Sequence, residues 1–390
     1  MPATRETAPG RSPARRLKNR LSCLAARPLR RPRLTAGQLL ALRPQRILVV
    51  RQQNQMGDMV CATPALRAIR ETWPAARITL VTAPVNVQVV RHNPLLDRVL
   101  TFAQAYWRRP AALLRFLREV REGPPDLAIV LASVSFSVTS AFLGLLSGAR
   151  WVVGGDGRPF GWDLGEVAFS LRLPSQPLLD RHAVDHSLAP LQAVGITTAD
   201  RSTLVVPSPG ERAEAARILT ALGLADGFWA LHPGAGKAQN LWPAERFAAV
   251  ARRAADAGKQ VLVLHGPADG PQLGALAAAA GDAWGAAVVP APTCPVGVAA
   301  ALLARAGRLL CNDTGIMHVA GALPVPTLAL FGPTDPGLWK PPSPAVVALR
   351  SPARTPDLRG QEYGWMENLA VDAVWEAWSG LAAASPASGR

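Results

Sequence analysis

The sequence has few cysteines, and none is spaced for a metal site or a disulfide framework. The four cysteines are far apart and form no Cys-x-x-Cys pair. This spacing argues against a zinc module and against a small domain held together by disulfides. We expect small buried apolar side chains at all four positions, Cys23, Cys61, Cys294 and Cys311.

Long apolar runs are missing as well. No uninterrupted run approaches the ~20 residues that span a bilayer, and the N-terminus lacks the apolar core of a signal peptide. With 49% hydrophobic residues in 390, the composition is that of a globular protein with about two domains. We therefore expect a cytoplasmic protein.

Acidic residues are scarce at the N-terminus. The formal net charge is +15, and twelve of the 42 Lys and Arg fall between Met1 and Arg46 against one acid, Glu6. The remainder is nearly balanced and has no basic patches interleaved with aromatic residues, so no nucleic-acid partner is expected. A basic arm of this kind favours attachment to an anionic surface.

The sequence is compatible with two structures for this arm. Residues 1–43 are expected to be a disordered, solvated tail, because Pro28 and Pro32 interrupt any long helix. The alternative is a short basic helix able to lie on acidic lipid, with three leucines on one side, at Leu17, Leu21 and Leu24.

From Arg46 onward, β-rich runs alternate with segments of helical period, the pattern of parallel sheets with crossover helices. The first series predicts strands at 47–50, 77–82, 97–101, 126–131 and 150–153, and helices at 58–72, 106–122 and 135–146. Residues 154–206 show no sustained period and are expected to be loops. The second series predicts strands at 228–232, 260–265, 286–289, 308–311 and 327–331, and helices at 244–257, 272–280, 296–306 and 315–322.

Two successive series of this kind predict an α/β fold in which two Rossmann-like domains face each other across a cleft. A tail with a closing helix over 371–384 follows. The expected division is a basic arm at 1–43, a first Rossmann-like domain at 44–206, a second at 207–345, and the C-terminal tail at 346–390.

Three loops at expected strand ends carry residues capable of chemistry. In the first, residues 52–58, Gly57 is expected to give a tight turn and a close backbone approach, and Asp58 begins a helix. An aspartate there is commonly a simple N-cap, so this loop alone leaves Asp58 open between a cap and a functional carboxylate.

The second loop is "LHPGAGKAQNLWPAERF". Its glycine amides and Lys237, beside a helix N-terminus, are suited to neutralising a diphosphate, and the alternative is an ordinary βα turn. In the third loop, Asp313-Thr314-Gly315 offers hydroxyl and amide groups for phosphate or ribose, with a further turn at Gly332-Pro333-Thr334-Asp335. His318 follows in the first helical turn, as a site residue or as a buried, hydrogen-bonded histidine.

Taken together, four segments resemble glycosyltransferase family 9, the ADP-heptose:lipopolysaccharide heptosyltransferases, over about Arg46 to Lys340. They are "ILVVRQQNQMGDMVCATPALRAIRETWP", "HPGAGKAQNLWPAERF", "CNDTGIMHVAGAL" and "LFGPTDP", in this order. The resemblance implies the GT-B fold and a metal-independent glycosyltransferase without a cofactor, which uses a nucleotide-sugar co-substrate, ADP-heptose. It makes the first domain the acceptor domain and the second the nucleotide-sugar domain. It also implies a membrane-embedded acceptor, so the basic arm is expected to make peripheral contact with the cytoplasmic face of the inner membrane.

The resemblance also assigns roles. It makes Asp58 the general base, and places His232-Pro233-Gly234 and Trp242-Pro243 at the nucleotide diphosphate. The expected donor-binding residues are Gly234, Lys237, Asn240, Asp313, Thr314, Gly315, His318 and Gly332. The expected acceptor or loop residues are Gln52, Asn54, Gly57 and Thr63.

Two positions depart from the family pattern. Asn240 stands where the family usually carries a lysine, so Lys237 is expected to take over its charge, and Asp269 matches poorly an acidic residue that helps to hold the donor sugar. The function expected is inverting transfer of a sugar, heptose in the family, to the lipopolysaccharide inner core or a related lipid-linked glycan. The alternatives are a non-catalytic nucleotide-sugar-binding protein and a nucleotide-sugar epimerase of the same fold.

Overall fold

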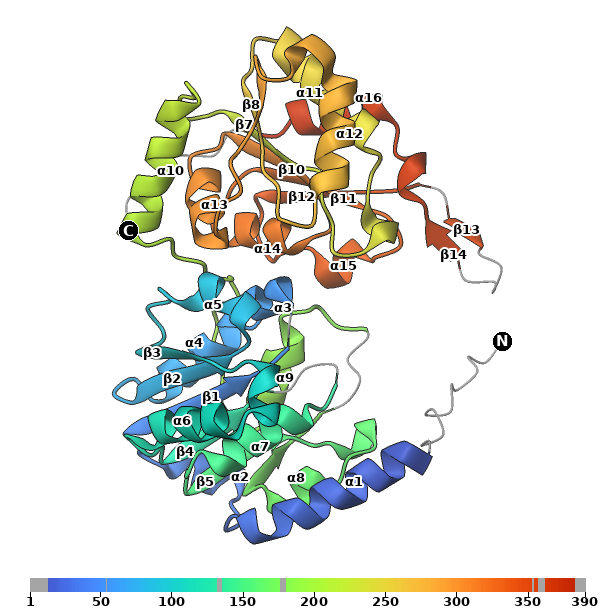
Figure 1. Cartoon of the computed structure of the whole chain (residues 1–390). Coiled ribbons are helices and arrows are strands. Elements are labelled where there is room, and N and C mark those ends of the chain that lie inside the picture. The colour runs from blue at the N-terminus through green and yellow to red at the C-terminus, as the bar shows by residue number, and fades with distance from the viewer. Residues whose placement is uncertain are drawn as a thin grey trace.

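The computed structural model describes residues 13–53, 55–131, 135–175, 180–352, 354–356 and 362–382. Two six-stranded sheets, each covered by helices, form two domains that face each other (Figure 1). All strand pairs in both sheets are parallel. The predicted α/β fold of two Rossmann-like domains is confirmed. Within the described residues, no helix has the length and apolar content to cross a bilayer.

The sheet of the first domain has the strand order β3-β2-β1-β4-β5-β6. Its strands form because short apolar runs are buried on both faces, as the wholly buried β4 illustrates. The order reverses between β1 and β4, so the loop that follows β1 opens at the switch point of the sheet, where ligands bind. The strands are β1 (Arg46–Arg51), β2 (Arg77–Thr82), β3 (Arg98–Thr101), β4 (Leu127–Val130), β5 (Trp151–Gly155) and β6 (Leu171–Leu173).

The helix predicted over 58–72 is two helices in the structure. Pro64 lies at the second position of the second one, where its missing N–H is tolerated and a new helix starts. Residues 154–206, expected to be loops, also hold β6 and two short helices. The helices of the first domain are α3 (Met56–Cys61), α4 (Thr63–Thr72), α5 (Pro84–Val90), α6 (Pro110–Arg121), α7 (Val138–Leu146), α8 (Leu164–Ala168) and α9 (Asp185–Gln192).

The sheet of the second domain has the order β12-β11-β10-β7-β8-β9 and reverses between β7 and β10. Its strands are β7 (Trp229–His232), β8 (Val261–Val263), β9 (Val288–Pro290), β10 (Arg308–Asn312), β11 (Thr327–Phe331) and β12 (Val346–Arg350). The helices are α10 (Pro209–Ala221), α11 (Ala244–Asp256), α12 (Gly270–Ala280), α13 (Val296–Leu303), α14 (Gly315–Ala322), α15 (Pro336–Trp339) and α16 (Val371–Ser379).

The C-terminal region departs from the expected division at residue 345. β12 pairs with β11, so the second sheet extends through Arg350. A two-stranded antiparallel pair follows, β13 (Arg354–Pro356) and β14 (Glu362–Gly364). The closing helix α16 then packs Trp378 against Trp229 with their rings 4.6 Å apart.

The expectation of a disordered arm is wrong for residues 13–43. They form α1 (Pro13–Ala26) and α2 (Ala36–Ala41), which lie on the first domain (Figure 1). Asn19 of α1 donates to the Asp163 carboxylate at 2.6 Å and accepts from the Asp163 amide at 2.9 Å. Pro28 does not interrupt α1, because that helix ends before it. Residues 1–12 lie outside the described part of the chain.

We predict that Leu39→Ala lowers the free energy of unfolding by about 2–4 kcal/mol. Leu39 of α2 has no exposed surface and lies in the main hydrophobic cluster, so its truncation leaves a cavity. Leu40→Ala is the matched control, because that neighbouring side chain is 36% exposed, and we expect a loss under about 1 kcal/mol. Chemical denaturation measures the free energy of unfolding of both variants. Equally small losses in the two would mean that α2 does not contribute to the core of the first domain.

Candidate active site

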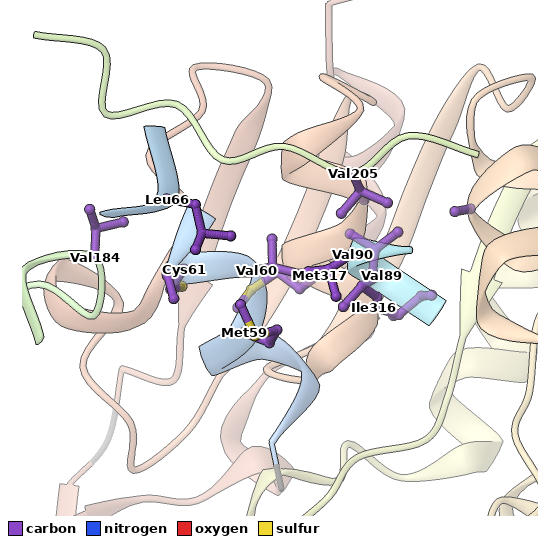
Figure 2. Packing of buried hydrophobic residues seen from close by; sticks show 14 of the residues in the cluster. Met59, Val60, Cys61, Leu66, Val89, Val90, Val184, Val205, Ile316 and Met317 are labelled. Carbon is purple, nitrogen blue, oxygen red and sulfur yellow. The ribbon is translucent and has the colours of Figure 1, made fainter. Parts of the chain in front are cut away.

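The two domains meet through α3 and α14, which are joined by apolar packing. Figure 2 shows Val60 of α3 and Val89 and Val90 of α5 gathered against Ile316 and Met317 of α14. All of them belong to one buried cluster that continues into the cores of both domains. The facing strand ends are therefore held at a fixed spacing.

Two glycines permit this close approach. A Cβ atom on Gly57 of α3 would lie 2.6 Å from Cδ2 of His318, and one on Gly315 of α14 would lie 2.5 Å from Cε of Met56. Real Cβ atoms do not come this close to a neighbour, so a side chain at position 57 would displace the buried His318 ring, and one at position 315 would displace the flexible end of Met56. Gly57 lies inside α3, and it serves the close approach that the sequence predicted rather than a turn.

A cavity of about 460 Å³ opens beside this contact and is lined by both domains. The first domain contributes residues from the loop after β1 and from α3. The second contributes residues from the loops after β7, β10 and β11. The lining residues are Gln55, Met56, Gly57, Asp58, Gly236, Lys237, Asn240, Asp313, Thr314, Gly315, His318, Thr334 and Trp339.

Asp58 presents a free carboxylate to this cavity. Helix α3 begins at Met56 with Gln55 as its N-cap, so Asp58 lies within the first turn and the simple N-cap interpretation is wrong. Its carboxylate has no hydrogen bond or ion pair with any residue that the structure describes, although the side chain is half-buried. A carboxylate that lines a cavity and has no partner of its own is suited to accept a proton from a hydroxyl bound there.

Arg51, which was not predicted as a site residue, binds the main chain of Asp58. Its buried guanidinium donates to the main-chain carbonyl of Asp58 at 2.8 Å and to Oγ of Ser187 at 2.9 Å. Burial lowers the pKa of Arg51, and the nearby charge of Asp58 opposes that shift. An arginine ending an otherwise apolar strand was the signal in the sequence.

Across the cavity, Asn240 joins two loops. Its amide donates to the Asp313 carboxylate at 3.0 Å, and its carbonyl accepts from the Thr334 hydroxyl at 3.5 Å. Burial raises the pKa of Asp313, while the hydrogen bond from Thr334 and the charge of Lys237 partly offset this shift. Asn240 thus holds Asp313 in place with a neutral donor, at the position where the family usually has a charge.

The second domain also provides groups that suit an anion. Helix α14 begins at Gly315, and its N-cap Thr314 makes no capping bond through its side chain. The first amides of the helix are therefore available at the cavity, where the helix dipole adds positive potential. Lys237 is exposed and is the one lysine or arginine among the described residues that line the cavity.

His318 lines the cavity as a neutral group. It is 5% exposed, and its Nδ1 lies 3.3 Å from Sγ of Cys61 on the other domain. Burial, with a smaller contribution from His182, lowers the pKa of His318 to about 4. The histidine therefore carries no charge near neutral pH and contributes packing and hydrogen bonding rather than positive potential.

Several expected donor residues lie away from the cavity wall. Gly234 is buried against the Asp269 carboxylate, which accepts from the amide of Gly266 at 2.7 Å and so shapes the neighbouring loop. Gly332 is also buried and is not among the lining residues. Trp242 belongs to the core of the second domain, where its ring nitrogen donates to the Leu369 carbonyl at 3.1 Å.

Two of the expected acceptor residues, Thr63 and Gln52, also lie away from the cavity wall. Thr63 is fully buried, donates to the Val60 carbonyl at 2.7 Å and accepts from the Leu204 amide at 3.0 Å, so its role is structural. Gln52 is 5% exposed, and neither of its side-chain amide atoms has a partner in the described structure. It does not line the cavity, and Asn54 lies outside the described residues.

Asn312, which was not predicted from the sequence, positions the loop after β7. It is fully buried at the end of β10, and its amide donates to the carbonyls of Pro233 at 2.8 Å and Gly234 at 3.3 Å. Its carbonyl accepts from the amide of Trp242 at 3.2 Å. One side chain therefore fixes both ends of the loop that carries Lys237 and Asn240.

A second cavity, of about 350 Å³, lies at the opposite edge of the first sheet. Arg46, Arg77 and Arg98 line it at the amino ends of β1, β2 and β3. Parallel sheets bind their ligands at the carboxyl ends of the strands. The cavity between the domains is therefore the candidate active site.

The chain is similar to known proteins in both sequence and fold. The model of glycosyltransferase family 9 (heptosyltransferase) matches residues 113–363. Lipopolysaccharide heptosyltransferase 1 of Pseudomonas aeruginosa is 28% identical over 315 residues, which cover 75% of this chain and 80% of that protein. A family 9 glycosyl transferase structure from Veillonella parvula has a TM-score of 0.69 at 25% identity, covering 78% of this chain and 86% of that one. E. coli ADP-heptose lps heptosyltransferase II has the same fold, with a TM-score of 0.69 at 21% identity, covering 86% and 97% of the two chains.

We predict that Gly57→Ala lowers the free energy of unfolding by about 1–2 kcal/mol, because overpacking against His318 exceeds the gain in helix propensity. In a His318→Ala background the same substitution should cost at least about 1 kcal/mol less, since the ring it meets is gone. Gly37→Ala is the control, as no atom lies within 4 Å of the added methyl group, and it should be neutral or stabilising. Denaturant titration of the wild type, the two single variants and the double variant measures the coupling between Gly57 and His318. An equal cost of Gly57→Ala in both backgrounds would contradict the predicted contact.

Proposed function

Because the chain belongs to glycosyltransferase family 9 and is therefore a glycosyltransferase, we propose that it transfers heptose from ADP-heptose to the lipopolysaccharide inner core or a related lipid-linked glycan. The family's description and the name of the Pseudomonas relative support heptose and a lipopolysaccharide acceptor. The observation that carries the proposal is the Asp58 carboxylate, which has no partner among the described residues and shares one cavity with Asp313-Thr314-Gly315 of the other domain.

The reaction proposed is a single displacement with inversion at the anomeric carbon. The acceptor hydroxyl oxygen forms the new bond to that carbon while the bond to the nucleotide diphosphate breaks. Asp58 accepts the proton of the hydroxyl, which makes the oxygen a better nucleophile as the bond forms. The Arg51 hydrogen bond to the main chain of Asp58 keeps α3, and with it the carboxylate, in position.

The second domain would hold the donor. The diphosphate needs fixed positive groups as its charge grows in the transition state, and Lys237 with the first amides of α14 supplies them. Asp313, held by Asn240, is suited to accept hydrogen bonds from sugar hydroxyls. Asn240 brings no charge, so the diphosphate depends on Lys237 more than it would with a lysine at both positions.

The acceptor would approach from the first domain, which carries Asp58. A lipid-linked glycan stays at the membrane, so the enzyme must work at the bilayer surface, and we place it at the cytoplasmic face of the inner membrane. The basic N-terminal segment is the part of the chain suited to anionic lipid.

We predict that Asp58→Asn lowers kcat by about 10²–10⁴-fold, the contribution of a positioned base. The amide keeps the size of the side chain but cannot accept the proton. Nucleotide release from ADP-heptose with saturating truncated lipopolysaccharide measures the rate. Donor affinity and the melting temperature should hold, because the carboxylate has no partner in the described structure.

The matched control for Asp58→Asn is Glu71→Gln, which removes an exposed carboxylate from the neighbouring helix α4. It should leave kcat unchanged. Near wild-type turnover in Asp58→Asn would remove Asp58 from the chemistry and leave the fold assignment intact.

We predict that Asp313→Ala weakens ADP-heptose binding by about tenfold or more, since a hydrogen bond to a charged group contributes about 1.5–3 kcal/mol. The melting temperature of the free protein should fall little or rise, because burial raises the pKa of Asp313 and its ionised form is costly in the empty site. Calorimetric titration and a thermal scan test both parts. A large loss of stability without loss of affinity would make Asp313 a structural residue.

A further inference from the structure

Helix α1 has two faces of opposite character. Its packed face consists of Asn19, Cys23 and Ala26, which lie against the first domain and are buried or partly buried. Besides the paired hydrogen bonds between Asn19 and Asp163, the guanidinium of Arg15 donates to the Phe160 carbonyl. The helix is thus attached to the body of the protein along one side, next to α8 on the outer surface (Figure 1).

The opposite face is an exposed stripe of leucines. Leu17, Leu21 and Leu24 are 58%, 56% and 59% exposed and are among the most exposed large apolar side chains of the described chain. Like the packed residues, they follow one another at four and three residues, and so form one stripe. The two stripes are offset by two positions, or about 200° around the helix, which points the leucines directly away from the protein.

Basic side chains border this leucine stripe on both sides. Arg20 lies three residues after Leu17 and four before Leu24, and Lys18 lies three residues before Leu21. Arg16 lies one turn before Arg20 on the same side of the stripe. These cations are exposed and form no ion pair with the described residues. No acidic residue occurs in α1, so nothing on the helix would repel an anionic surface.

We propose that α1 is a membrane-docking helix, which lies in the interface of an anionic bilayer with Leu17, Leu21 and Leu24 inserted and the flanking cations at the lipid phosphates. An apolar stripe bordered by Lys and Arg is the pattern of helices that lie in the bilayer surface. The charge favours this occupant over a second copy of the chain, because two such helices would bring their cations together.

The docking surface gives the membrane contact of the proposed function a defined location, and to that extent it rests on that function. It also fixes an orientation. Because the Asn19–Asp163 pair holds α1 on the first domain, the bilayer would lie against the domain that carries Asp58 rather than against the donor domain. The enzyme would dock as a rigid body and not through a flexible tether.

The experiment is flotation of the full-length protein with vesicles of phosphatidylcholine, with and without phosphatidylglycerol. We expect binding to the anionic vesicles only, which weakens as salt is raised. Leu17→Ser/Leu21→Ser/Leu24→Ser should lower the partition coefficient about tenfold or more. Arg16→Gln/Arg20→Gln should lower it by about fivefold for each cation removed.

Helix α6 offers matched controls, because Leu114 is 54% exposed there and Arg115 and Arg118 are exposed beside it, without a leucine stripe. Leu114→Ser and Arg115→Gln/Arg118→Gln should bind vesicles as the wild type does. Equal losses in the α6 and α1 variants, full binding by the triple leucine variant, or equal binding to neutral vesicles would each overturn the proposal. So would a wild-type dimer in sedimentation that the triple variant abolishes, since the stripe would then cover a second copy.

Two further measurements separate this inference from the proposed function. Each α1 variant should keep the wild-type melting temperature and transfer heptose at the wild-type rate to a soluble truncated acceptor, since the substituted side chains are mostly exposed. Vesicle binding without any sugar transfer would contradict the proposed function and leave the docking surface standing. Transfer to the soluble acceptor without vesicle binding would do the reverse.

Discussion

The candidate site depends on how closely α3 and α14 approach. Gly57 meets the ring of His318 and Gly315 meets the side chain of Met56, so each helix presents backbone to a side chain of the other. The contact continues into a buried cluster shared by both domains, which makes the spacing a property of two cores rather than of a loop. Asp58 and the N-terminus of α14 face the same cavity because the helices that carry them are packed together.

Within this frame, charge is distributed unequally between the two domains. The first offers the Asp58 carboxylate, which has no partner in the described part of the chain, and a buried arginine that donates to the main-chain carbonyl of Asp58. The second offers a lysine, helix amides, a neutral histidine, and an aspartate whose pKa is raised. A proton acceptor on one side and anion-binding groups on the other are what a displacement between an alcohol and a nucleotide diphosphate requires.

Much of this arrangement was predictable from the sequence, because parallel strands buried on both faces read as continuous apolar runs. Ten of the twelve strands in the two large sheets were located in this way, while β6, with three residues, and the edge strand β12 were missed. The cavity residues Asp58, Lys237 and Asp313 were found because they follow strands at the switch points. The residues that support the cavity-lining residues without lining the cavity themselves were not predictable. Thr63 begins α4, Gly234 lies in the loop after β7, and Asn312 ends β10. Only their hydrogen bonds and burial reveal that they support the residues lining the site.

The N-terminal helix shows why a count of charges was insufficient there. The net charge and the two prolines favour a solvated tail. Neither feature depends on which residues lie on which side of a helix. The attachment of α1 to the first domain depends on Asn19, a polar side chain that is 6% exposed and forms paired hydrogen bonds with Asp163. Such a pair satisfies both polar groups of the amide and fixes the rotation of the helix about its axis. Once that rotation is fixed, Leu17, Leu21 and Leu24 cannot turn inward to join the core, and the apolar surface they expose is the consequence of a polar contact on the opposite face.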